Sequence, residues 1–275
     1  MTTTLRPAGP ERREADGTRA RTYTVCVNSR PVGGLELGTS HRYGPSVGRI
    51  EALVIDEPDR RRGRGTVAAL AAEEVLRQWG CTRVETSVPA DSAYALRMAV
   101  ALGYAERSRI MAKPLDASAS PHPLPPGSAV RPLTEAEYGP WRDHERAGFV
   151  ATLTERGVPR DQAEAHEASA FASVLPDGPA TEGTVLLVLD HEGAAVGRLW
   201  VRVTEPAWVF SVEVEADQRG RGHGRTLMLI AENASREAGA ATLVLNVFAG
   251  NTPAIRLYES LGYVATEHHF AKALG

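Results

Sequence analysis

The stretch RGRGHG at residues 219–224 has an earlier counterpart in the same chain, RRRGRG at residues 60–65. Both read Arg-x-x-Gly-x-Gly, and they lie 159 residues apart. Glycines in such a loop let backbone N–H groups turn inward, and a helix that begins directly after it adds the positive end of its dipole. Each stretch therefore predicts a loop that can bind an anion such as a pyrophosphate.

The same offset holds without a gap across residues 52–115 and 211–274, which indicates that the chain contains a duplication. Further upstream the offset becomes 164, so the first copy carries five extra residues before its motif. The matches that support the duplication are LGY at 102–104 with LGY at 261–263, MAKPL at 111–115 with FAKAL at 270–274, and Val32-Gly33 with Val196-Gly197.

Composition divides the chain into four segments. Residues 1–21 are polar and predict a disordered tail. The first copy occupies 22–115, and the proline-rich stretch 116–127 predicts an extended linker. The second copy occupies 128–275, and only its strands are preceded by two helix-like stretches. The first copy is therefore expected to be truncated.

Apolar periodicity in the second copy predicts strands that alternate with helices. Two β-branched runs at 184–190 and 195–203 flank a turn and predict a hairpin. A third strand at 208–214 leads into the glycine-rich loop, and the apolar spacing over 225–239 is helical. This order predicts a mixed α/β sheet. The other predicted elements are helices over 134–157, 159–175 and 251–262, a strand over 241–248, and a last strand that ends at 270–274.

Charge and cysteine content exclude several classes of protein. The 31 basic and 34 acidic residues give a net charge of −3, which excludes an electrostatic nucleic-acid binder of the whole-surface kind. No apolar run approaches the ~18 residues of a membrane helix, and the first residues lack the apolar core of a signal peptide. Two cysteines, Cys26 and Cys81, make neither a disulfide framework nor a zinc site. We expect a cytoplasmic protein without a metal, a nucleic-acid partner or a membrane partner.

The glycine-rich loop, its helix, the next strand and the pattern N-x-x-A-x-x-x-Y-x-x-x-G-Y at 251–263 together resemble the GNAT superfamily of acyl-CoA-dependent N-acetyltransferases. The resemblance covers about 128–275 in full and about 22–115 in part. The pair of copies resembles the tandem arrangement of the mycothiol synthase type. It implies two units, each a mixed, mostly antiparallel twisted sheet flanked by helices, the first of them degenerate.

The resemblance also implies site residues in the second copy, with acetyl-CoA as the co-substrate. Tyr258 is implied as the general acid, since a phenol with a pKa near 10 can protonate a thiolate with a pKa near 8.5. Asn251 is implied to bond the pantetheine arm or the chain near it. Backbone groups of Val212 and Val214 are implied to hold the thioester carbonyl and pantetheine. The residues whose amides are implied to hold the pyrophosphate are Arg219, Gly220, Arg221, Gly222, His223, Gly224 and Arg225.

The sequence departs from the family's pattern at the general base. The glutamate that several GNAT families use would fall at Trp208 or Asn246, and neither side chain is a base. Glu213 is the catalytic candidate in this chain, although strand alternation leaves open which way its side chain points. A chain of water molecules is the alternative.

In the first copy Ala99 stands at the position of Tyr258 and Ser92 at that of Asn251, so this copy is expected not to catalyse transfer. The main hypothesis is an acetyl-CoA-dependent N-acetyltransferase whose C-terminal domain acetylates a primary amine of an unidentified small molecule or peptide. Two alternatives stay open: a non-catalytic acyl-CoA-binding sensor or scaffold, and an acyltransferase that uses another acyl group or acceptor. The sequence also leaves open whether the protein forms a homodimer.

Overall fold

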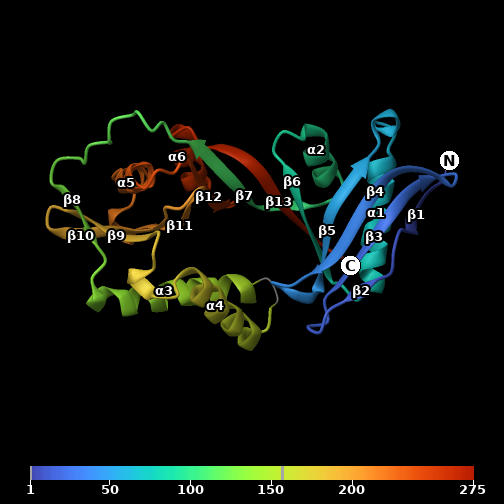
Figure 1. The fold of residues 1–275 in the computed structure, drawn as a ribbon, viewed down its shortest axis with the longest axis horizontal. Coiled ribbons are helices and arrows are strands. Elements are labelled where there is room, and N and C mark those ends of the chain that lie inside the picture. The colour runs from blue at the N-terminus through green and yellow to red at the C-terminus, as the bar shows by residue number, and fades with distance from the viewer. Residues whose placement is uncertain (1, 156–157) are drawn as a thin grey trace. The chain divides into compact units, whose positions relative to one another are not determined.

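The computed structural model describes residues 2–155 and 158–275, which divide into two compact units. Unit 1 consists of Met1–Ser108 together with Glu267–Gly275, and unit 2 of Arg109–Thr266. Each unit has a sheet with helices packed on it (Figure 1). The pairing of adjacent strands is mostly antiparallel, so the predicted fold class is confirmed.

The sheet of unit 2 runs in the order β7-β12-β11-β10-β9-β8. Strands β8 to β11 pair antiparallel, whereas β11 and β12 pair parallel. The predicted hairpin and third strand are therefore present. The strand bounds are β7 (Ala105–Pro114), β8 (Ser128–Pro132), β9 (Thr184–His191), β10 (Ala194–Arg202), β11 (Ala207–Val214) and β12 (Thr242–Phe248).

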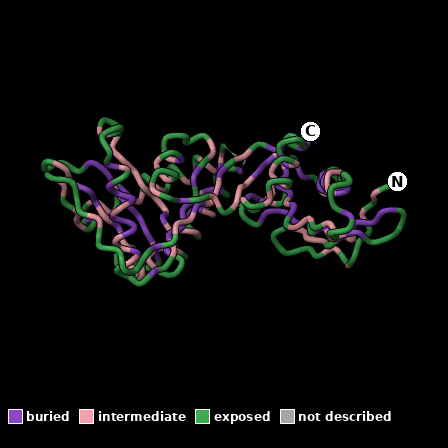
Figure 2. Tube along the Cα trace, turned by 90° about the horizontal axis from the view of Figure 1, so that it is seen from above, coloured by how far each residue is buried: buried purple, intermediate pink, exposed green. Residues whose placement is uncertain are grey.

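Helices cover both faces of this sheet. Helix α5 (His223–Glu237) packs on one face, where Leu227 and Met228 are fully buried. Helices α3 (Glu135–Thr154) and α4 (Arg160–Val174) lie on the other face, over a core that includes Trp200 (Figure 1). Figure 2 colours the chain by burial, and within this sheet the buried residues are most frequent in β10 and β12. The last helix of the unit is α6 (Thr252–Ser260), and Arg156 and Gly157 of the predicted helix 134–157 lie outside the described residues.

Unit 1 repeats this plan with the strand order β1-β3-β4-β5-β6-β13, and β2 pairs β3. Its helices are α1 (Arg64–Gln78) and α2 (Ala93–Ala101), which correspond to α5 and α6. Its strand bounds are β1 (Thr3–Pro7), β2 (Arg12–Arg13), β3 (Arg19–Val27), β4 (Arg30–Ser40), β5 (Gly44–Ile55), β6 (Arg83–Pro89) and β13 (Val264–Ala273).

The structure differs from the predicted disordered tail at the start of the chain. Strand β1 pairs antiparallel with Tyr23–Val27 of β3, as β8 pairs with β9 in unit 2. Its one large apolar residue, Leu5, packs against the core of unit 1, and its exposed polar residues suit an edge strand. The first copy therefore has the leading strand and, among the described residues, lacks counterparts of helices α3 and α4.

The predicted domain boundaries at 115 and 275 differ from the two units, because the copies exchange their last strands. Residues 267–273 of β13 pair with β6 in unit 1, whereas β7 from Arg109 onward lies beside β12 in unit 2. Lys272 Nζ lies 2.7 Å from an oxygen of buried Glu73. Lys113 Nζ lies 2.7 Å from buried Glu232. Since the two copies end alike, each ending fits the other's helix, and the sequence could not reveal the exchange.

Candidate active site

The site in unit 2 begins where β11 separates from β12. The two strands pair only from Ala207–Val209 with Leu243–Leu245, although both strands continue. The ladder between β11 and β10 shifts at the same place and skips Phe210. A bulge of this kind bends a strand and increases its twist, which accounts for the separation from β12.

Backbone groups on the free edge of β11 are available to a ligand. Glu215 N donates to Val196 O of β10, at 3.0 Å. Because N–H groups alternate between the two edges of a strand, those of Val212 and Val214 lie on the edge opposite β10. The structure thus brings the two backbone positions singled out by the sequence to the edge where pairing with β12 has ended.

The glycine-rich loop that follows β11 leads into the start of α5. Gly220 and Gly222 have φ values of 79° and 91°, in the left-handed region that favours glycine. Gly222 is the N-cap of α5 and provides no side-chain hydrogen bond to the first turn. The amides of that turn are therefore free to bind an anion. A surface hollow of about 510 Å³ lies at this loop, lined among others by Arg221, His223 and Arg225.

The side chains of the loop have mainly structural contacts. Arg219 Nε donates to Val214 O at 3.2 Å and fixes the loop to the end of β11. Arg225 donates to Ser260 Oγ of α6 at 2.5 Å. Burial lowers the pKa of His223, so this ring tends to be neutral near pH 7. The first turn of α5 therefore offers its backbone amides, more than these side chains, to a ligand.

Helix α6 positions Tyr258 and Asn251. Asn251 is the N-cap, and its side-chain oxygen accepts from Ala254 N at 3.2 Å. A Cβ added to Gly224 would lie 3.3 Å from Leu257 and 3.9 Å from Val214, so the start of α5 sits between β11 and α6. Tyr258 is half-buried and packs against the core that also includes Val212 and Val214. Burial raises the pKa of Tyr258, so its phenol keeps its proton at neutral pH.

Two carboxylates, one from β11 and one from α3, lie on the opposite face of β11. Glu213, the predicted catalytic residue, lies 3.0 Å from His144 Nε2 of α3. Ser211 Oγ donates to Glu145 Oε1 of α3 at 2.7 Å. The bulge at Phe210 places Phe210 and Ser211 on this same face. Strict alternation from Val209, which is buried on the α5 side, would place Ser211 on that side as well, and the bulge places it on the α3 side instead.

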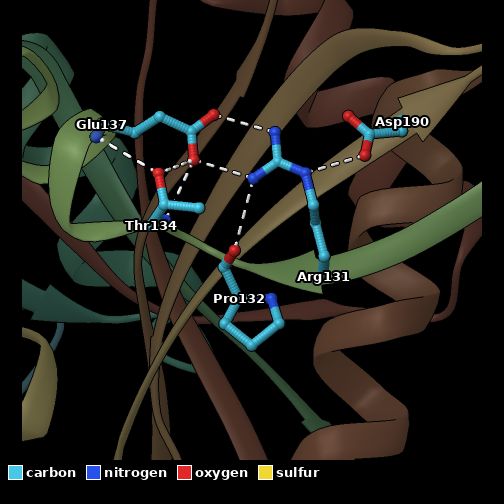
Figure 3. A network of polar contacts seen from close by, with 5 residues as sticks. All are labelled: Arg131, Pro132, Thr134, Glu137 and Asp190. Carbon is cyan, nitrogen blue, oxygen red and sulfur yellow. Dashed lines mark hydrogen bonds and ion pairs between the residues drawn. The ribbon is translucent and has the colours of Figure 1, made fainter.

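Helix α3 is anchored at its start by a polar network on β8 and β9 (Figure 3). Thr134 and Glu137 form a capping box. Arg131 donates to both oxygens of Glu137, at 2.7 and 2.8 Å, and to Asp190 at 2.8 Å. This network fixes the helix that holds Glu145 and His144 over β11.

Unit 1 has the same local geometry with different chemistry. Arg61 and Gly63, at the positions equivalent to Gly220 and Gly222, also have positive φ values. Arg60 Nε donates to Ile55 O, as Arg219 Nε does to Val214 O. A hollow of about 420 Å³ lies there. Buried Asp59 binds Arg30 and Arg64, and Ala99 occupies the position of Tyr258.

The sequence reasoning missed Glu145 and Ser211. Glu145 lies on a helix whose acidic and basic residues look like a solvated face. The only available signal was that the chain lacks the usual glutamate on β11, which leaves room for a carboxylate from another element.

Comparison with known proteins defines the class. Residues 3–104 and 140–263 match the acetyltransferase (GNAT) family. The chain belongs to this family, whose members use acetyl-CoA, and it contains the domain twice.

Individual relatives are similar over both copies. A mycothiol acetyltransferase of Thermomonospora curvata is 32% identical over 77% of this chain and 69% of its own length. A mycothiol acetyltransferase of Saccharomonospora viridis is 26% identical over 98% of this chain and 89% of its own length. The crystal structure of a GCN5-related N-acetyltransferase from Sphaerobacter thermophilus has a TM-score of 0.60 at 20% identity, over 92% of this chain and 80% of that one.

None of the helices among the described residues is both long and apolar enough to cross a membrane. Within the same residues, no group of three or more His, Cys, Asp and Glu side chains could hold a metal ion.

Proposed function

We propose that unit 2 transfers the acetyl group of acetyl-CoA to a primary amine of a small molecule or peptide. The observation that carries the proposal is the free edge of β11 beside the uncapped first turn of α5. It combines amides for a carbonyl oxygen with amides for a pyrophosphate, within one continuous segment of chain.

The loop after β11 leaves its backbone accessible to a ligand such as acetyl-CoA. A Cβ at Gly220 or Gly222 would meet no atom within 4 Å, so the backbone is open to a ligand. Amides of Arg219 to Arg225 would hold the pyrophosphate, and the β11 edge at Val212 and Val214 would hold the pantetheine arm. Asn251 would help through its side-chain NH₂, because its oxygen caps α6.

Bound acetyl-CoA supplies an acyl thioester. The N–H of Val212 would stabilise the negative charge that grows on the carbonyl oxygen when the amine attacks. Tyr258 would give its phenol proton to the departing sulfur. The amine must also lose a proton, and Glu213 is one candidate acceptor on the α3 side of β11.

The acceptor class is part of this proposal. The names of the two relatives make amines related to mycothiol the first acceptors to test. The test is a thiol-release assay on the full chain with acetyl-CoA, these amines, spermidine, kanamycin and a peptide with a free N-terminus. We expect thiol release above the rate without amine for at least one acceptor. Binding of acetyl-CoA without release for any of them would favour the sensor or scaffold.

A further inference from the structure

A carboxylate on α3 reaches the face of β11 that the proposed amine must approach. Glu145 is half-buried and accepts a hydrogen bond from Ser211, the residue next to Val212. Ser211 and Glu145 come from different elements, and the network at Arg131 and Glu137 fixes the helix that carries Glu145. The carboxylate is thus held beside the strand position proposed for the acyl carbonyl.

The group that donates a proton to sulfur and the group that accepts a proton from the amine should lie on opposite faces of β11. Tyr258 packs on the α5 side, with Val212 and Val214. Glu145 lies on the α3 side, with Ser211. Because β12 has left β11 at this point, an acyl group on the strand edge can be approached from both faces.

Among the nearby carboxylates, Glu145 is the one best suited to accept a proton. Glu215 is paired with Arg198 at 2.5 Å, and Glu213 is paired with the exposed His144. In both pairs the carboxylate is already bound to a basic side chain. The Glu145 carboxylate accepts from the hydroxyl of Ser211 and from the side chain of Trp141, two neutral groups that orient it without neutralising its charge.

We infer that Glu145 is the catalytic residue that takes the proton of the attacking amine, and that Ser211 positions it. This inference rests on the proposed transfer to an amine. The amine nitrogen bonds to the thioester carbonyl carbon as the carbon–sulfur bond breaks. The proton lost by nitrogen goes to Glu145, and the phenol proton of Tyr258 goes to sulfur.

Burial raises the pKa of Glu145 above its usual range, which makes the carboxylate a stronger base. The Ser211 hydrogen bond stabilises the charged form and opposes part of that rise. The other charged groups that face Glu145 are Glu213 on β11 and His144 on α3. Ser211→Ala should therefore raise the pKa of Glu145 further.

The first arm of the test needs no acetyl-CoA. The carboxyl carbon of Glu145 is followed by NMR titration in the full chain, assigned by its loss in Glu145→Gln. We expect Glu145 to titrate above the ordinary glutamate range and to move to higher pH in Ser211→Ala. Titration in the ordinary range in both proteins would overturn the inference.

The second arm measures thiol release with acetyl-CoA and the amine panel named above. Glu145→Gln keeps the oxygen that Ser211 contacts, and kcat should fall by about 10²- to 10⁴-fold with an unchanged calorimetric Kd for acetyl-CoA. In Ser211→Ala the acidic limb of the pH–kcat profile should move to higher pH. Asp143→Asn, an exposed carboxylate on the same helix, is the matched control. A loss below about threefold in Glu145→Gln, or a larger loss in Glu213→Gln, would overturn the assignment.

The two arms separate two kinds of failure. If the wild-type chain acetylates no amine of the panel, the proposed function fails, whereas the NMR titration still decides whether Glu145 has the property that the inference requires.

Discussion

Tyr258 is the residue on which the proposed chemistry depends most. Its ring packs against Tyr263, with 6.0 Å between the ring centroids, so it also contributes to the core. Tyr258→Phe keeps that packing and removes only the hydroxyl. We expect kcat to fall by about 10²- to 10⁴-fold, as for loss of a positioned general acid, with an unchanged Kd for acetyl-CoA. Steady-state kinetics and calorimetry check this, and a loss below about threefold with lower stability would make Tyr258 a packing residue.

Gly222 is the residue that shapes the loop proposed to bind the pyrophosphate. Gly222→Ala places a Cβ at φ 91°, which should destabilise the protein by about 1–2 kcal/mol and turn the first amides of α5. The matched control is Gly239→Ala, at φ 83° just after the end of α5, because its strain is similar and it lies outside the loop. We expect both to lower unfolding midpoints in urea, but only Gly222→Ala to weaken acetyl-CoA binding. Equal Kd values for the two variants would contradict the loop's role.

At the scale of an element, α3 depends on the network at its start. The Arg131 guanidinium and the Thr134 amide hold the pKa of Glu137 at about 2, below its ordinary value of 4.5. A carboxyl with a lowered pKa in the folded state stabilises the protein above pH 4.5, and this contribution disappears as the pH falls toward 2. The placement of Glu145 over β11 should therefore weaken at acid pH.

Glu137→Gln tests this anchor. It should destabilise the protein by about 1 kcal/mol or more near pH 6, since it removes an ion pair and weakens the capping box. The difference from wild type should narrow between pH 6 and pH 3, in urea unfolding followed by circular dichroism. Glu135→Gln, at the first position of the same helix, is the control and should show a small difference at both pH values. A difference for Glu137→Gln that stays constant with pH would contradict the account.

Most elements were predictable because their signals are local. Periodicity defined β9, β10, β11 and α5, and proline after Asn251 marked the start of α6. The β11 bulge was not predictable, because an unpaired residue such as Phe210 leaves no mark in the alternation. For the same reason the contact between Ser211 and Glu145 depends on a tertiary arrangement that composition and spacing do not encode.

At the scale of the whole molecule, the exchange of the last strands makes each unit depend on both copies of the sequence. Each of the two lysines of the chain lies on an exchanged strand and pairs with a glutamate of the other copy. Their partners, Glu73 and Glu232, have side chains only 1% exposed. A fragment that holds one copy alone would leave one of these carboxylates without its lysine, so functional tests belong on the full chain.

Lys272→Met tests the exchange. Removing one partner of a buried ion pair typically costs about 3–5 kcal/mol, because the other charge stays buried. The second contact of Glu73, Arg77 at 3.8 Å, should keep the cost near the lower end of about 3 kcal/mol. Adding Glu73→Gln should recover part of the loss in urea unfolding. A change below about 0.5 kcal/mol in Lys272→Met would show that the pair does not hold β13 in unit 1.

The central claim is that unit 2, and not unit 1, transfers the acetyl group. Gly222 and Gly63 are equivalent N-caps, with φ values of 91° and 73° and no atom within 4 Å of an added Cβ. Thiol release by the full chain, with Gly222→Val compared with Gly63→Val at matched stability, is the most direct measurement. We predict that kcat/KM for acetyl-CoA falls at least about tenfold in Gly222→Val and less than about twofold in Gly63→Val. The reverse result, a loss confined to Gly63→Val, would contradict the claim and assign catalysis to unit 1.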